Sequence, residues 1–100
     1  MTKKEMTALL MIDPDSWRNV AKGYYRFVYA PGACYEILVN FSTDCEINDL
    51  NNATATLYST GTWRDKDGKT VFERESIFAG TITECMFAAK KDYEENVTEE

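Results

Sequence analysis

A block of alternating side chains in the middle of the chain most constrains what the chain can fold into. The alternation has a period of two, the pattern of a β-strand, and predicts four strands over residues 24–29, 35–41, 53–62 and 70–78. Pro31-Gly32 and Asp67-Gly68 lie between neighbouring stretches and favour tight turns. Short turns join antiparallel strands, and no helices alternate with the strands. We therefore expect an antiparallel meander and not a nucleotide-binding α/β fold.

Helix-forming segments flank this block. Residues 3–11 are rich in helix formers, although residues 9–12 could equally form a buried strand. Asp13-Pro14 has the residue types of a helix N-cap and first helical position, and predicts a second short helix over residues 13–22. After the block, the capping-box spacing of residues 81–84 predicts a C-terminal helix. An apolar stripe at helical spacing follows: Ile82, Cys85, Met86, Ala89 and Tyr93.

These elements predict a fold of the α+β class, a four-stranded antiparallel β-meander flanked by N-terminal and C-terminal helices. A length of 100 residues suits one domain with one core. The net charge of −6 is concentrated at the C-terminus, because residues 92–100 hold five acids and no base, leaving twelve acids against eleven bases elsewhere. We therefore expect a single domain over residues 1–93 and an acidic, frayed tail over residues 94–100.

The cysteines and the apolar runs indicate a reducing compartment. Cys34, Cys45 and Cys85 are an odd number without Cys-x-x-Cys spacing, which argues against a disulfide framework and a structural zinc site. The longest apolar run, Ala8–Ile12, is much shorter than the roughly 18 residues of a membrane span. The N-terminus also lacks the features of a signal peptide. We expect a cytoplasmic protein without a membrane partner.

The residues that usually carry enzyme chemistry are missing or poorly placed. The chain has no histidine, which removes the commonest general base and histidine-ligated metals. It has no glycine-rich phosphate loop, and the acids of residues 44–49 lack the glycine and terminal glutamate of an EF-hand. We expect Cys34 and Cys85 to be buried structural thiols, and Cys45, between two acids, to be a poor nucleophile. No catalytic residue, cofactor or metal is expected.

Charged residues on the fourth predicted strand are the exceptions. Glu73 and Glu75 share one face and could act as a carboxylate pair if they lined a cleft. Arg74 lies on the opposite face together with Phe78, so it either faces solvent or meets an acid such as Glu36. A structural ion pair is favoured over a ligand-binding arginine.

The first predicted hairpin carries large apolar groups on both faces. The face opposite its tyrosine-rich side holds Tyr24, Val28 and Leu38. One terminal helix covers one face, so the other face needs the second helix or another protein chain. Aromatic-rich, weakly charged surface is typical of interface cores, which points to binding between proteins.

The leading hypothesis is a small non-enzymatic protein-binding domain, of interaction or inhibitor type, that acts through an aromatic-rich sheet surface and forms a homodimer. An acidic inhibitor of a nucleic-acid-binding enzyme, of the sort mobile elements encode, is a special case that the near-neutral body disfavours. Nucleic-acid binding is itself disfavoured, because no basic patch or RNA-recognition motif is present. The alternative is a small-molecule-binding domain with an aromatic pocket between helix and sheet, and an enzyme using carboxylates or a cysteine is third. The candidate interface or pocket residues are Tyr24, Val28, Leu38, Tyr25, Tyr29, Tyr35, Trp63 and Arg74.

Overall fold

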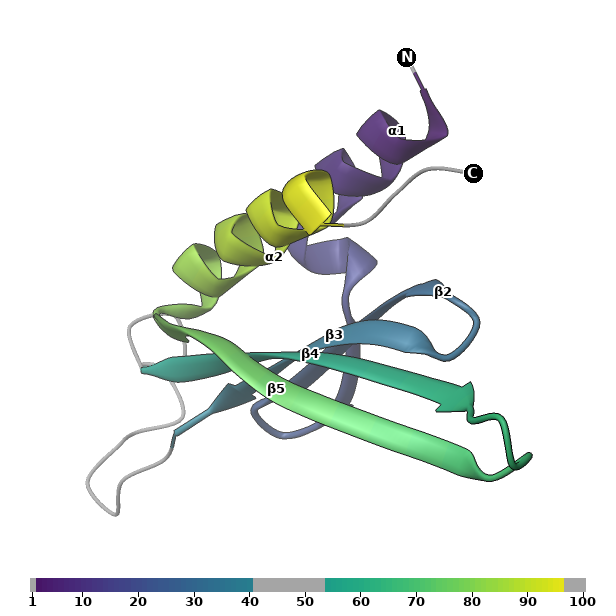
Figure 1. Cartoon of the computed structure of the whole chain (residues 1–100). Coiled ribbons are helices and arrows are strands. Elements are labelled where there is room, and N and C mark those ends of the chain that lie inside the picture. The colour runs from purple at the N-terminus through teal and green to yellow at the C-terminus, as the bar shows by residue number, and fades with distance from the viewer. Residues whose placement is uncertain (1, 41–53, 97–100) are drawn as a thin grey trace.

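The computed structural model describes residues 2–40 and 54–96. Within these residues it shows a five-stranded antiparallel sheet with two helices on one side (Figure 1). The elements in chain order are α1 (Lys3–Leu10), the 3-10 turn η1 (Pro14–Ser16), β1 (Arg18–Ala21), β2 (Tyr24–Ala30), β3 (Ala33–Val39), β4 (Ala55–Arg64), β5 (Thr70–Gly80) and α2 (Ile82–Asn96). The strands lie in the sheet in the order β1-β2-β3-β4-β5. The predicted α+β class, antiparallel meander and terminal helices are confirmed, and the strand count is five instead of four.

The extra strand, β1, replaces most of the helix predicted over residues 13–22, so that prediction is wrong. Asp13 does act as a cap, because its side chain accepts a hydrogen bond from the Asp15 amide at 3.0 Å, but only one turn follows. The Trp17 indole then donates to the Met11 carbonyl at 2.8 Å and its ring packs 5.5 Å from that of Phe27. A short isolated helix is marginal, so burial of Trp17 and pairing of β1 with β2 prevail.

The core lies between the helices and one face of the sheet. The largest fully buried side chains are Tyr35, Met11, Ile37, Leu57 and Cys85. The predicted capping box of α2 is confirmed, because the Thr81 amide donates to Glu84 Oε1 at 3.0 Å and the Glu84 amide donates to Thr81 Oγ1 at 3.2 Å. Four residues of the predicted apolar stripe are buried: Cys85, Met86, Ala89 and Tyr93. Neither helix in the described residues is long and apolar enough to cross a bilayer.

A bulge in β5 changes which face its last residues occupy. Tyr58 pairs with Ser76 while the preceding Leu57 pairs with Phe78, so Ile77 is an extra residue opposite β4. Phe78 therefore shares the helix-covered face with Leu57, and the prediction that it shares a face with Arg74 is wrong. The alternation of side chains did not reveal the bulge, because neither face of this strand is uniformly apolar.

The C-terminal helix extends beyond the predicted domain boundary at residue 93. It continues to Asn96, and the Lys4 ammonium donates to the Glu94 carbonyl at 3.0 Å, which links α1 to this last turn. The expectations for Cys45, for the acids of residues 44–49 and for residues 97–100 lie outside the described residues.

The predicted turn at Gly32 brings two strands into close contact. Gly32 has φ +76°, its carbonyl accepts a hydrogen bond from the Thr62 amide at 2.6 Å, and an added Cβ would lie 2.8 Å from the Thr62 carbonyl oxygen. Gly68, at the tip between β4 and β5, has a similar φ of +80°, but an added Cβ there would have no neighbour within 4 Å. The two glycines share a backbone conformation and differ in crowding.

We therefore expect Gly32→Ala to destabilise the fold more than Gly68→Ala. Positive φ costs each alanine about 1 kcal/mol, and the clash at Gly32 adds about 1 kcal/mol or more. In a domain of this size the additional loss corresponds to a melting temperature about 5 °C lower than that of Gly68→Ala. Equal melting temperatures would show that β4 and the turn at Gly32 are not in tight contact.

Candidate functional site

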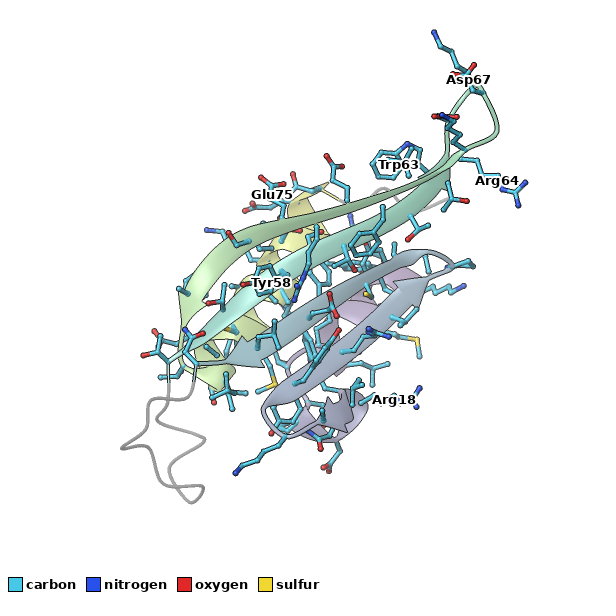
Figure 2. All side chains as sticks on the ribbon, turned by 90° about the horizontal axis from the view of Figure 1, so that it is seen from below. Arg18, Tyr58, Trp63, Arg64, Asp67 and Glu75 are labelled. Carbon is cyan, nitrogen blue, oxygen red and sulfur yellow. The ribbon has the colours of Figure 1, made fainter. Side chains whose placement is uncertain are left out.

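The two helices leave the opposite face of the sheet uncovered by any described element. Figure 1 shows α1 and α2 on the same side of the strands, and Figure 2 views the molecule from the other side, with the strands in front. We call this uncovered surface the open face. Strand alternation and register place on it Arg18, Tyr24, Arg26, Val28, Cys34, Glu36, Leu38, Thr56, Tyr58, Thr60, Thr62, Arg64, Phe72, Arg74 and Ser76.

A buried glutamate sits at the centre of the open face. Glu36, on β3, is only 4% exposed. Its Oε2 lies 3.3 Å from Nη2 of Arg26 on β2, and its Oε1 lies 3.4 Å from Nε of Arg74 on β5. The expectation that Arg74 meets an acid such as Glu36 is confirmed. A buried carboxylate is tolerable because two cations compensate for its lost hydration.

Two tyrosines hold these arginines against the sheet. Arg26 donates from Nη2 to the Tyr24 hydroxyl at 2.8 Å, and its guanidinium lies 5.6 Å from the centre of that ring. The guanidinium of Arg74 lies 4.0 Å from the centre of the Tyr58 ring, a stacked cation–π arrangement. Arg26 Nε is buried without an acceptor, so the cluster keeps one unsatisfied donor. The arginines are therefore partly preorganised and not fully paired.

All four arginines of the chain lie on the open face. Arg18 pairs directly with Arg26 across β1 and β2, and Arg64 shares the side of Thr62, two residues earlier on β4. Figure 2 shows Arg18 on the β1 side of the sheet and Arg64 near the β4–β5 tip. Glu36 is the one acid that the described strands place here. The open face thus carries three net positive charges on a chain whose net charge is −6.

Exposed apolar side chains accompany the arginines. Val28 is 63% exposed and Phe72 is 64% exposed, while Tyr24 and Leu38 are half-buried. A shallow groove of about 420 Å³ runs over the face and is lined by residues of β2, β3, β4 and β5. Sequence analysis predicted Tyr24, Val28, Leu38 and Arg74 as site residues, and the structure brings these four to one surface.

The sequence analysis missed the basic patch. Its arginines are spread from position 18 to position 74 and no two are adjacent, so only the strand register gathers them. One signal was available, because Arg26 and Arg74 alternate in phase with Val28 and Phe72. Arg18 could not be placed from the sequence, since its segment was predicted to be helical.

The predicted aromatic pocket between helix and sheet does not form as one site. The Tyr35 ring is fully buried, 5.2 Å from Tyr29, and its hydroxyl donates to Asp92 Oδ2 at 2.5 Å. Tyr25 lines a separate cavity of about 120 Å³ near α2. Trp63 lies near the end of β4, 46% exposed, and lines none of the cavities found in the described residues.

The cysteines divide between the core and the open face. Burial raises the pKa of the Cys85 thiol to about 11, and the side chain is fully buried as predicted. Cys34 is half-buried on the open face beside Thr60, so the prediction that it is a core residue is wrong. Cys34 alternates in phase with Glu36 and Leu38, so it lies on the open face. The sequence analysis expected a helix or another protein chain to cover that face.

The remaining candidates offer little chemistry. Glu73 and Glu75 are exposed and lie opposite Gly61 and Ser59 on the other side of the sheet from Glu36. Three cavities in residues 2–40 and 54–96, of about 500, 420 and 120 Å³, are lined by neither of these carboxylates. The same residues contain no group of three or more acids or cysteines that could hold a metal ion. A second groove, of about 500 Å³, lies between β5 and α2 and is lined by residues that include Phe78 and Phe87.

We expect Glu36→Gln to destabilise the fold by about 1–2 kcal/mol. The change removes the charge that compensates Arg26 and Arg74, and the cost stays below that of a fully buried pair because both arginines are partly exposed. The melting temperature should fall by about 5–10 °C. Glu75→Gln is the matched control, an exposed acid on which the same change costs less than about 0.5 kcal/mol. Equal melting temperatures for the two variants would contradict a stabilising role for Glu36.

Stability should be constant near neutral pH and fall at alkaline pH. Burial raises the pKa of Cys85 from 9.0 to about 11, and burial together with the hydrogen bond to Asp92 raises the pKa of Tyr35 above its ordinary value of 10.0. Both folded-state values lie above the unfolded ones. The stability that the neutral forms contribute is thus complete below pH 9 and lost as the pH rises through the folded values.

Urea unfolding between pH 7 and pH 11 measures this loss. Wild type should lose on the order of 2 kcal/mol more than Cys85→Ala between pH 9 and pH 11, because one pKa unit corresponds to about 1.4 kcal/mol. A Cys85→Ala profile parallel to that of wild type would contradict the burial argument.

Comparisons with protein-family models, with curated proteins and with solved structures found no match. No activity, substrate or partner therefore comes to this chain from a relative.

Proposed function

We propose that the open face binds another protein, and that the chain is a small non-enzymatic protein-binding domain. The observation that carries the proposal is the composition of the face, on which four arginines lie among exposed apolar and aromatic side chains. None of the seven lysines of the chain lies in a described strand. Arginine and aromatic residues are enriched in interface cores, where lysine and acids are depleted.

The choice of arginine over lysine has a physical reason. A guanidinium is planar and weakly hydrated, so it can stack on a ring and still donate several hydrogen bonds. Arg74 stacks on Tyr58 in this way, and Arg26 does so more loosely on Tyr24. Side chains that are already held in place lose less entropy when a partner binds, and arginine and tyrosine are common among the residues that dominate binding energy.

A second copy of the chain is disfavoured as the occupant of this face. Packing two open faces together would place eight arginines and two copies of Glu36 in one interface, and like charges across an interface oppose association. We therefore propose a different protein as the partner. Self-association through another surface, such as the groove between β5 and α2, stays a prediction.

The other two functional hypotheses have weaker support. The cavity beside Tyr25, at about 120 Å³, is smaller than the roughly 300–1,000 Å³ of ligand pockets. The two larger grooves are open to solvent and would enclose little of a small molecule. For an enzyme, the chain supplies no histidine, and the Glu73 and Glu75 carboxylates are exposed outside any described cleft. The inhibitor of a nucleic-acid-binding enzyme stays a special case of protein binding.

Affinity capture with matched variants tests protein binding. Phe72→Ser removes an exposed ring from the open face, whereas Phe87→Ser removes an exposed ring from α2, on the helix side. Both side chains are more than half exposed, so both variants should keep wild-type melting temperatures. Wild type and Phe87→Ser, used as bait in an extract of the native host, should recover the same protein in stoichiometric amount. Phe72→Ser should recover at least about tenfold less of that protein, because an aromatic anchor contributes more than about 1.4 kcal/mol to binding.

Two results of the capture experiment would count against the proposal. Equal recovery by Phe72→Ser and Phe87→Ser would show that the binding surface lies elsewhere. Recovery of no stoichiometric protein by wild type would favour a different class of function.

A further inference from the structure

We infer that the partner presents an acidic polypeptide segment to the open face, with carboxylates that pair with Arg18, Arg26 and Arg64 and apolar side chains that contact Phe72 and Val28. This inference rests on the proposed function and specifies the chemistry of the partner. Three independent observations carry it: the separation of charge, an unfavourable arginine pair, and the occupied faces of the tyrosine rings.

The separation of charge favours an anionic partner. On the far side of the sheet from the open face, α2 holds four acids and two lysines, a net charge of −2, while all four arginines lie on the open face. A surface with one sign of charge attracts its opposite and speeds association with it. The three net positive charges are confined to the open face, so they attract an anionic segment small enough to lie on the sheet.

The pairing of Arg18 with Arg26 is only partly compensated by an acid in the described residues. The two residues are direct cross-strand neighbours, and like charges in that position are destabilising. Glu36 contacts Arg26 but already shares its charge with Arg74. An unfavourable local arrangement such as this pair of like charges is expected mainly at functional sites. A carboxylate placed between Arg18 and Arg26 would remove the repulsion.

Arg64 marks the other end of the proposed site. Arg64 is exposed, and within the described residues neither Arg64 nor Arg18 forms an ion pair. Along the strand direction, the register places Val28 and Phe72 at levels between these two arginines, and they are the most exposed large apolar side chains of the face. The arrangement fits a segment in which acids flank apolar or aromatic residues.

The tyrosine rings distinguish a polypeptide from a single-stranded nucleic acid. Nucleic acids that bind on a sheet stack their bases on open aromatic rings. On the open face, Arg74 lies over the Tyr58 ring and Arg26 lies beside the Tyr24 ring, which leaves Phe72 as the aromatic side chain there without a cation over it. The occupied rings therefore favour a polypeptide over a single-stranded nucleic acid.

Binding of defined polyanions tests the inference. The probes are a random glutamate–tyrosine copolymer and a single-stranded dT20 oligonucleotide, each fluorescently labelled and titrated at low salt. We expect the copolymer to bind more tightly than dT20 and to shift the NMR signals of the Arg18, Arg26 and Arg64 Nε–H groups. Raising the salt concentration should weaken the complex, because exposed charges are screened.

A charge-matched pair of double variants locates the site. Arg18→Gln with Arg64→Gln should weaken copolymer binding about tenfold. Lys3→Gln with Lys91→Gln changes the net charge equally on the two helices and should alter binding less than about twofold. All four side chains are exposed, so both double variants should fold, which thermal melting checks.

Each contrary outcome has a distinct meaning. Tighter binding of dT20 than of the copolymer would replace the polypeptide with a nucleic acid and overturn the inference. Equal weakening by the two double variants would show an effect of bulk charge and overturn the site. No binding of the copolymer would overturn the acidic partner but not protein binding itself, which the comparison of Phe72→Ser with Phe87→Ser tests separately.

Discussion

The ion pairs of Glu36 with Arg26 and Arg74 are the interaction on which the open face depends. They join β2, β3 and β5 across the intervening β4. A sheet face without a covering helix would ordinarily keep its charges apart and hydrated, yet here a buried carboxylate holds two arginines close together. Each arginine is thereby positioned against a tyrosine ring. The result is a surface that is positively charged, apolar in parts and preorganised.

The one-sided placement of the helices explains why a chain with a net charge of −6 can carry such a surface. Met11 and the buried stripe of α2 complete the core on one side of the sheet, and α2 carries a net charge of −2 there. The strands hold every arginine on the other side. Net charge calculated over the whole chain therefore hides a separation of charge across the sheet. The proposed acidic partner depends on that separation and not on the total charge.

The fold could be predicted from local signals wherever one physical effect prevailed. The turn at Pro31-Gly32 and the capping box at residues 81–84 act through neighbouring residues, so sequence was sufficient for them. The helix predicted after Asp13 failed because Trp17 is buried against Met11 and Phe27, six and ten residues away in the chain, and a capping pattern does not encode these contacts. Half of the predicted site residues meet on one surface, but the arginine patch depends on register across five strands. The bulge at Ile77 likewise has no local signature.

Solvent accessibility of methyl groups tests most directly whether the open face is a free binding surface in the isolated protein. A soluble paramagnetic agent should strongly broaden the NMR signals of the Val28 methyls and leave those of Leu57 sharp, since Val28 is 63% exposed and Leu57 is fully buried. The contrast should be the same at dilute and at high protein concentration. Protection of the Val28 methyls in the dilute protein would show that the chain covers this face itself. Protection that develops with concentration would show that a second copy covers it, and either result would contradict a free face that binds an acidic partner.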